Sequence, residues 1–305
     1  MSVRKTATVG VRWLWVVFFA LLVLTPVLDL GYPDWLRFLP AAAAVAISAA
    51  LGRAARRRID AREAGPVETA SPVAGRWTAL NSPADRVPSH GTHECAQSFA
   101  IDIVAESAES AESAAHAVSA DSAGNAVSAA SVERPRPRFA LLWPIARRNR
   151  DFPGFGAPLY AVADATVVRA IDRRRDHMSR NSVPGLLWLL VEGVVRMLGG
   201  TGPILGNHLV LDLGDGVHAL YAHLRRGSLA VREGERVSAG QLLARCGNSG
   251  NSTEPHLHFQ LMDGPDPEAA HGVPFTWRGI GVPRNKETFT AQPAAPQNAS
   301  ASSMS

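Results

Sequence analysis

Two histidines in the C-terminal half of the sequence are the first residues whose spacing suggests chemistry. His256 and His258 lie two positions apart in the segment EPHLHF, which runs from Glu254 to Phe259. Side chains two apart in a strand point to the same face, so one imidazole can bind a metal ion while the other reaches a water or substrate beside it. For this short motif taken alone, a chance pair of surface histidines is the alternative.

Two further elements carry a polar side chain in apolar surroundings. His223 lies near the end of the alternating segment from Val217 to Leu224, and Asp102 lies inside the apolar run from Ile101 to Val104. A buried carboxylate without a partner is unfavourable, so Asp102 needs a cation or hydrogen-bond donors. A lone histidine at such a place is usually a surface or core residue, and this is the alternative for His223.

Upstream histidines in the segment SHGTH, at residues 89–93, complete a set of metal-binding side chains. Two imidazoles and one carboxylate form a catalytic zinc set that leaves the fourth position to water. Zinc held in this way lowers the pKa of the bound water to about 7 and polarises a carbonyl. A further histidine nearby is suited to act as a general base, because its pKa lies near the working pH.

The order of these motifs resembles the lysostaphin/LytM family of zinc peptidases. The resemblance rests on a histidine followed by Asp102, on the AHL element at 222–224, and on the run GNSGNSTEPHLHF at 247–259. The segment VREGERVSAGQLL, at 231–243, is similar to a hairpin of the same family. The resemblance implies a mostly β domain with an antiparallel sheet, the duplicated hybrid motif fold, which binds Zn²⁺ and hydrolyses peptide bonds in peptidoglycan cross-links.

The resemblance also implies a role for each matched residue. His258 and Asp102 are expected to be zinc ligands, and His223 and His256 are expected to act on the water and the tetrahedral intermediate. The first ligand departs from the common pattern, because Ser98 stands four residues before Asp102, where many members have a histidine. A longer loop then supplies this ligand, and we expect His90, with His93 as the alternative.

An apolar N-terminus precedes the domain. Residues 13–30 are almost wholly apolar and are near the length that spans a bilayer, and a shorter apolar stretch follows at 36–51. We expect a membrane anchor of one or two helices at 13–52, embedded in membrane lipid; a cleaved signal peptide is the alternative.

The basic residues around the apolar stretches predict the side of the membrane on which the domain lies. Basic residues precede the first apolar stretch and follow the second, and the positive-inside rule would then place both ends of a hairpin, and the domain, in the cytoplasm. Wall hydrolysis requires the opposite, so we expect a cell-membrane protein with an extracytoplasmic domain on the resemblance alone.

The remaining boundaries follow from composition. We expect a basic N-terminal segment at 1–12, a linker at 53–75, the peptidase domain at 76–289 and a disordered tail at 290–305. Within the domain, an Ala/Ser-rich stretch at 106–133 has few large apolar residues and predicts a disordered insertion. The run GLLWLLVEGVVRML at 185–198 predicts an apolar helix or a membrane-touching insertion that is too short to span a bilayer, with a buried core helix as the alternative.

The overall composition narrows the function further. A formal net charge of +4 over 305 residues is modest, so nucleic acid is not the expected partner. The two cysteines, Cys95 and Cys246, form neither a disulfide framework nor a CxxC metal site, and we expect free thiols. A LytM-type module that binds peptidoglycan or regulates other enzymes without turnover is the main alternative function. A lipoyl-type carrier is disfavoured, because residues 231–243 contain no lysine.

Overall fold

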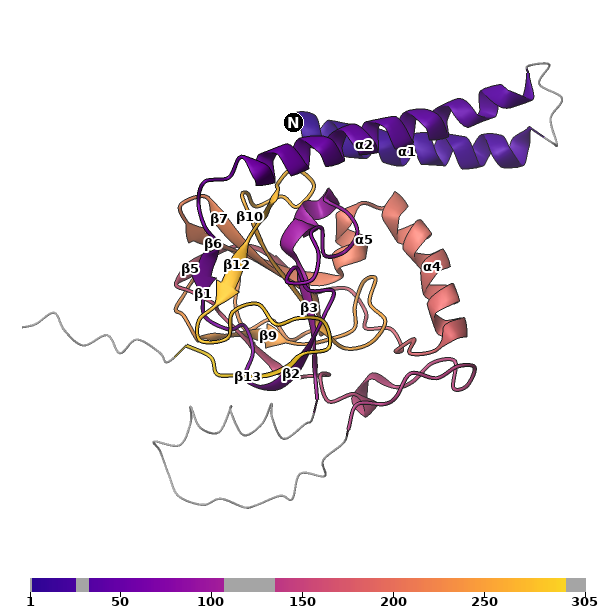
Figure 1. Ribbon diagram of the computed structural model, residues 1–305. Coiled ribbons are helices and arrows are strands. Elements are labelled where there is room, and N and C mark those ends of the chain that lie inside the picture. The colour runs from indigo at the N-terminus through magenta and orange to yellow at the C-terminus, as the bar shows by residue number, and fades with distance from the viewer. Residues whose placement is uncertain (1, 26–32, 107–134, 295–305) are drawn as a thin grey trace, which may run out of the picture.

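The protein, in a computed structural model, is described here over residues 2–25, 33–106 and 135–294. It consists of an antiparallel sheet with a helical hairpin along one edge and a separate helix on one side (Figure 1). The predicted insertion at 106–133 lies outside the described residues except for Glu106, and so does the part of the predicted tail from 295 onward.

The main sheet has nine strands in the order β13-β2-β3-β10-β7-β6-β5-β8, with β11 also paired to β10. All of its pairings are antiparallel, which confirms the predicted fold class. The strands are β2 (Gly75–Leu80), β3 (Ile101–Ala105), β5 (Ala165–Ile171), β6 (Asn207–Gly214), β7 (Val217–Leu224), β8 (Arg236–Val237), β10 (Leu257–Met262), β11 (Gly272–Val273) and β13 (Thr288–Ala291). Two small sheets pair β1 (Val67–Thr69) with β12 (Phe275–Trp277) and β4 (Pro158–Tyr160) with β9 (Leu242–Arg245).

Strands β6 and β7 are joined by a hairpin at Gly214, Asp215 and Gly216. Asp215 and Gly216 have φ angles of 51° and 72°. Two consecutive residues in the left-handed region match the right-handed twist of the flanking strands, which is why Asp-Gly suits this position.

Aromatic rings fill the core between the sheet and β12. Phe259 of β10 packs at centroid distances of 5.3 Å from Tyr221, 5.2 Å from Phe275 and 5.9 Å from Trp277. All four side chains are buried. Because β10 and β7 lie in the middle of the sheet, this cluster fixes the two strands that carry His258 and His223, and His256 directly precedes β10.

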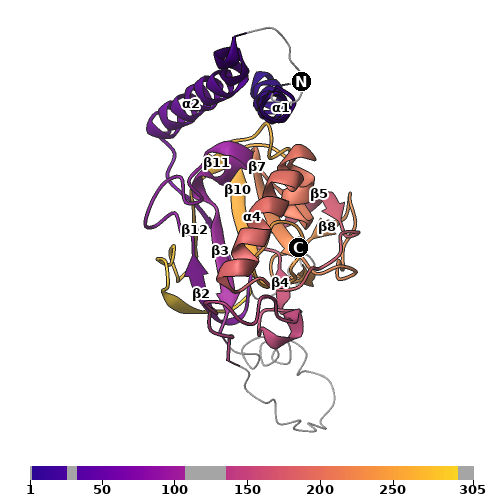
Figure 2. The same ribbon diagram turned by 90° about the vertical axis from the view of Figure 1, so that its right-hand side faces the viewer.

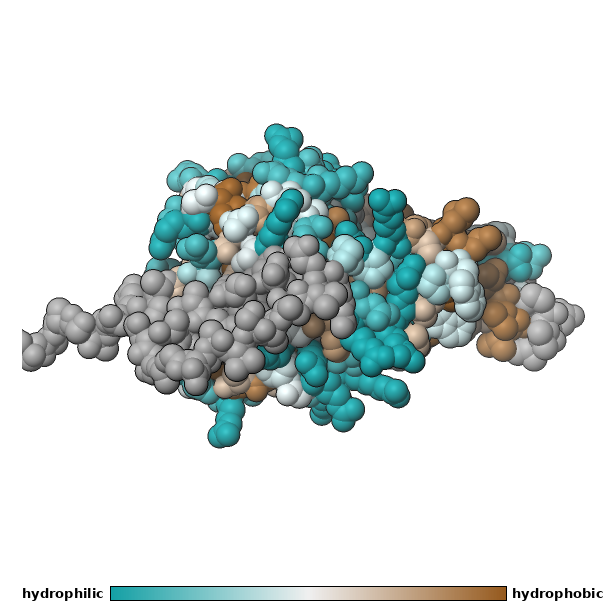
Figure 3. All heavy atoms as spheres, turned by 90° about the horizontal axis from the view of Figure 1, so that it is seen from below, coloured by the Kyte–Doolittle hydropathy of each residue, from teal (hydrophilic) through white to brown (hydrophobic). Residues whose placement is uncertain are grey.

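Helices α1 (Val3–Leu24) and α2 (Leu39–Asp60), with the 3₁₀ turn η1 (Asp34–Phe38), form the N-terminal hairpin. Both segments are long and apolar enough to cross a membrane. Apolar side chains are prominent at the end of the molecule where the hairpin projects (Figure 3).

The hairpin differs from the predicted boundaries. Helix α1 begins at Val3 within the predicted basic segment, because Lys5 and Arg12 pair with Asp266 and Glu268 of the domain. Helix α2 continues to Asp60, and β1 also falls inside the predicted linker at 53–75.

One long helix and three short helical elements remain in the described part of the chain. Helix α4 (Val183–Leu198) covers the predicted apolar insertion and begins two residues earlier, where Ser182 caps it by accepting from Gly185 N–H. The others are α5 (Thr201–Leu205), η2 (Glu94–Phe99) and η3 (Asn149–Asp151). At the C-terminal end, the predicted disordered tail is wrong for its first residues, because Thr290 and Ala291 belong to β13 and pair with β2.

Candidate metal centre and active site

Asp102 lies at the centre of a cluster of imidazoles. It occupies β3, and the sheet register places it directly opposite His258 of β10. Its Oδ1 atom lies 2.9 Å from His258 Nδ1, and its Oδ2 atom lies 3.0 Å from His90 Nε2. The carboxylate is buried in an apolar strand, and these imidazole nitrogens are the polar partners that a buried charge requires.

The loop before β3 supplies His90. Ser89 fixes this loop, because its buried hydroxyl lies 2.6 Å from the Ala100 carbonyl oxygen and 3.0 Å from His90 Nδ1. His90 Nε2 is thereby turned toward Asp102. One ligand atom from each of His90, Asp102 and His258 lies within 4.8 Å of the others.

This donor set fits a zinc ion. A tetrahedral zinc holds nitrogen and oxygen ligands at about 2.0–2.2 Å, which separates neighbouring ligand atoms by about 3.3–3.6 Å. The contacts of 2.9 Å and 3.0 Å to the Asp102 carboxylate are only slightly shorter than this. Two imidazoles with one buried carboxylate therefore match the chemistry and nearly the spacing of a catalytic zinc site.

Two more histidines line the same cluster. The His223 ring lies 4.7 Å from the His256 ring and 5.8 Å from the His258 ring, measured between centroids. His256 Nε2 lies 3.6 Å from Asp102 Oδ1. The structure thus brings together all five residues that sequence analysis singled out.

Backbone contacts orient these two rings. His223 Nδ1 lies 2.8 Å from the Ser249 carbonyl oxygen, and His256 Nδ1 lies 2.8 Å from the Glu254 carbonyl oxygen. Since a carbonyl can only accept, both Nδ1 atoms carry a proton, which leaves the Nε2 atom of each ring for other partners. His223 itself has φ of 62°, an uncommon value for a residue with a side chain and typical of functional sites.

The charges within the cluster shift its pKa values. Burial alone would raise the pKa of Asp102, but the nearby His90 and His256 and the hydrogen bond from His258 hold it well below its usual value. Burial lowers the pKa of His223 well below its usual value, and the neighbouring His256 and His258 lower it further. The cluster therefore combines an ionised carboxylate with a neutral His223.

Comparison with known proteins connects this cluster to a family. Residues 190–269 match the model of peptidase family M23. The chain is 38% identical over 71 residues to the peptidoglycan DD-endopeptidase ShyA of Vibrio cholerae, covering 23% of this chain and 16% of that protein. It is 43% identical over 72 residues to the glycyl-glycine endopeptidase ALE-1 of Staphylococcus capitis, covering 23% and 19%. Over residues 190–269, the chain is therefore similar to the LytM-type peptidases of family M23.

The solved catalytic domain of lysostaphin from Staphylococcus simulans is also similar. It is 25% identical, with 39% of this chain and 68% of that chain covered and a TM-score of 0.26. The chain spans less than a fifth of the length of ShyA and of ALE-1. The residues that match the M23 model, 190–269, include His223, His256 and His258, whereas His90 and Asp102 lie outside them.

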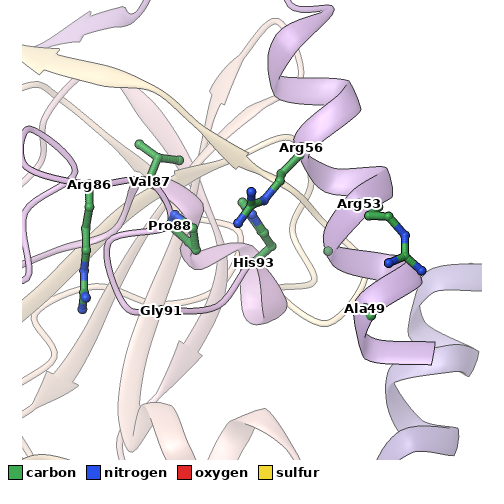
Figure 4. A pocket seen from close by; sticks show the side chains of 9 residues that line it. Ala49, Arg53, Arg56, Arg86, Val87, Pro88, Gly91 and His93 are labelled. Carbon is green, nitrogen blue, oxygen red and sulfur yellow. The ribbon is translucent and has the colours of Figure 1, made fainter. Parts of the chain in front are cut away.

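The structure separates the two histidines that the sequence left as alternatives for the first ligand. His93 Nδ1 lies 2.9 Å from the hydroxyl of Ser98, the residue four positions before Asp102. The imidazole faces a cavity of about 450 Å³ that Arg53 and Arg56 of α2 also line (Figure 4). Burial lowers the pKa of His93, and Arg56 and Arg4 lower it further. His93 therefore lies in a basic pocket, whereas His90 lies in the cluster around Asp102.

Two residues around the cluster were missed from the sequence. Gln260 Oε1 lies 3.0 Å from His258 Nε2, and the Gln260 amide donates to the Cys95 carbonyl oxygen. Asn81 donates to Asp102 Oδ2 at 2.9 Å. Gln260 could have been found, because it lies two residues after His258 and hence on the same face of β10. Asn81 follows the end of β2 and carries no such pattern.

Proposed function

We propose that this chain is a membrane-anchored zinc metalloendopeptidase that hydrolyses peptide bonds in peptidoglycan cross-links. The observation that carries the proposal is the convergence of His90, Asp102 and His258, whose ligand atoms lie within 4.8 Å of one another. A non-catalytic LytM-type binding or regulatory module is the competing function.

The proposed ligands are His90 through Nε2, Asp102 through its carboxylate and His258 through Nδ1. When bound, zinc supplies Lewis-acid activation of water and of the scissile carbonyl. Gln260 accepts from His258 Nε2–H and so directs Nδ1 toward Asp102, where Nδ1 would bind the metal in place of its proton. Asn81 holds Asp102 Oδ2 by donating to it.

His223 is the proposed general base. Its Nδ1–H is held by the Ser249 carbonyl, which leaves Nε2 as the ring atom that can accept a proton. His256 presents its Nε2 from the neighbouring position, held by Glu254 O. Once protonated, either imidazole can donate a hydrogen bond to a developing oxyanion, which these preorganised rings would stabilise.

Peptidoglycan peptides are the proposed substrate. The support comes from the relatives, of which ShyA and ALE-1 are named as a peptidoglycan DD-endopeptidase and a glycyl-glycine endopeptidase. The names of the relatives specify different bonds, so the proposal names the class of substrate and no particular bond.

Helices α1 and α2 are the proposed anchor, and peptidoglycan hydrolysis requires the domain to lie outside the cytoplasm. The arrangement of charges opposes this side, because Arg4, Lys5 and Arg12 of α1 and the basic end of α2 all lie at the domain end of the hairpin. A reporter fused after Ser305 decides between the two. Reporter activity in the cytoplasm would rule out wall hydrolysis and leave the metal site intact.

The activity is tested with the full chain purified in detergent. We expect about one zinc per chain, loss of that zinc in His258→Ala, and hydrolysis of cross-linked muropeptides by the wild type. His223→Ala should keep the zinc and lose about 10²–10⁴-fold in turnover, because it removes a general base and no ligand. A wild-type chain that binds muropeptides and cleaves none would identify the non-catalytic module instead.

A further inference from the structure

Helix α4 exposes an apolar face that the proposed peptidase chemistry does not use. Six apolar side chains on successive turns point away from the domain, and Leu190 among them is 67% exposed. Their spacing of three and four residues places them on one side of the helix. They are Leu187, Leu190, Val191, Val194, Val195 and Leu198. The alternative of a buried core helix is therefore wrong.

The opposite side of α4 is fixed to the domain. Leu189 is buried, and a Cβ atom on Gly185 would lie 2.7 Å from the Ile145 carbonyl oxygen. The two charged residues of the helix, Glu192 and Arg196, pair with each other at 2.7 Å. Since α4 is held on this side and its charges are paired, the helix cannot turn its apolar face inward.

A second exposed apolar segment adjoins the start of α4. Residues 139–145 run beside Ser182, which forms a bridge with Ala140 and donates to the Ile145 carbonyl oxygen at 2.8 Å. Trp143 in this segment is 79% exposed, and Leu141 and Leu142 are exposed as well. The outward side of α4 and residues 139–145 together form one surface, which we call the apolar face.

One end of the apolar face lies next to the proposed membrane anchor. Glu268 accepts from Arg12 of α1 at 2.7 Å and from the backbone N–H of Thr201 at 3.3 Å, three residues after the end of α4. The end of α4 is thereby held beside the residue that precedes the apolar run Trp13–Leu24. The hairpin projects toward the side of the sheet that carries α4 (Figure 1), and the view of that side has α4 on the near surface (Figure 2).

The length of α1 limits where the membrane can begin. Only 12 residues of α1 follow Arg12, which is about 18 Å of helix against a hydrocarbon core of about 30 Å. If the hairpin enters a bilayer while Arg12 stays paired with Glu268, the near surface of that bilayer must lie close to Arg12. The end of α4 is then at the depth of the headgroups.

We propose that the apolar face lies in the interface of the membrane that α1 and α2 enter, so that the domain rests on the lipid surface. The inference rests on the proposed anchoring. An interfacial helix buries an apolar side at the boundary between headgroups and acyl chains, and basic residues beside it favour anionic lipids. Arg138 and Arg148, both exposed, flank residues 139–145.

Spin labels on the full chain test the proposal in vesicles of phosphatidylethanolamine and phosphatidylglycerol. The labels go on Leu190→Cys and Leu142→Cys of the apolar face, on Phe19→Cys of α1, and on the exposed Glu68→Cys of β1 as the aqueous reference. In a Cys95→Ala background, Cys246 is the only native thiol that remains, and its burial protects it from the spin label. Collision rates with apolar oxygen and with a water-soluble nickel complex report the depth of each label.

We expect both labels on the apolar face to be lipid-exposed at a shallower depth than Phe19→Cys, with Glu68→Cys in water. Water exposure of both face labels, with Phe19→Cys in lipid, would overturn this inference and leave the anchor. Water exposure of Phe19→Cys as well would overturn both. Shielding of the face labels from both quenchers would mean that a protein covers the face, which also overturns the inference.

A charge variant tests whether the two segments dock together. Leu190→Glu combined with Val195→Glu should move the label at Leu142→Cys from lipid into water, because it places two carboxylates on the apolar face. The matched control is Leu242→Glu, at an exposed apolar residue of β9, which should leave that label in lipid. An unchanged label in the double variant would contradict joint docking.

Discussion

Gln260 and His258 lie on the same face of β10, and the side-chain oxygen of Gln260 accepts a hydrogen bond from His258 Nε2 at 3.0 Å. Both side chains are buried. This contact fixes the ring orientation in which His258 Nδ1 faces Asp102 at 2.9 Å. A buried partner of this kind orients a metal ligand and raises its basicity.

Replacing this partner should weaken metal binding without removing a ligand. We expect Gln260→Leu to lower zinc affinity by about 10–100-fold, measured by competition with a chelator of known affinity. Gln241→Leu, in a turn at the surface, should leave the affinity unchanged. Equal affinities in Gln260→Leu and the wild type would show that the His258 ring is held in place without Gln260.

The two histidines of the loop before β3 should respond differently to truncation. We expect His90→Ala to lose zinc in elemental analysis, because its Nε2 is 3.0 Å from Asp102 Oδ2. His93→Ala should retain about one zinc per chain, because that ring binds Ser98 and faces Arg53 and Arg56. The reverse result would make His93 the ligand and would require the loop to rearrange when metal binds.

The sequence predicted the parts of the site that depend on strand periodicity. Residues two apart share a face, so His256 and His258 were paired from spacing alone, and the buried carboxylate of Asp102 predicted a cationic or donor partner. The choice between His90 and His93 depends on Ser89 and Ser98, whose hydroxyls hold the loop. Loop conformation of this kind leaves no periodic pattern in the sequence.

Contacts between distant parts of the chain also could not be predicted from the sequence. The Arg12–Glu268 ion pair joins residues 256 positions apart and extends α1 into a segment predicted to be separate from the anchor. The exposure of α4 could not be read from its composition either, because an apolar run of that length suits a buried helix equally well.

The aromatic cluster behind the site should dominate the stability of the domain. Phe259→Ala removes a ring that packs against Tyr221, Phe275 and Trp277, and such truncations cost about 3–5 kcal/mol. We therefore expect the midpoint of thermal unfolding to fall by about 6–20 °C in calorimetry of the detergent-solubilised chain. Leu242→Ala, at a partly exposed position, should change the unfolding free energy by no more than about 0.5 kcal/mol. A small shift for Phe259→Ala would mean that the neighbouring rings repack into the space.

Stability of the metal-free chain should fall as the pH drops below the ordinary histidine pKa, and His208 of β6 provides a test away from the metal cluster. Burial lowers the pKa of His208, and Arg169 and Arg174 lower it further. Since its pKa is lower in the folded chain than in the unfolded chain, where it is about 6.5, the unfolded chain binds more protons in between. The contribution of neutral His208 is therefore fully present above about pH 6.5 and is lost as the pH falls toward the folded-state pKa.

We expect His208→Asn to flatten the fall in the unfolding midpoint between pH 7.5 and pH 5.0, measured with a chelator present. Asparagine keeps a donor for the Gly206 carbonyl oxygen, which His208 Nδ1 contacts at 2.9 Å, and cannot titrate in this range. The comparison at pH 7.5, where His208 is neutral in both states, measures the structural cost of the substitution and serves as the control. Parallel curves for the wild type and His208→Asn would show that His208 stays neutral or reaches water over the whole range, and that the acid sensitivity arises at other groups.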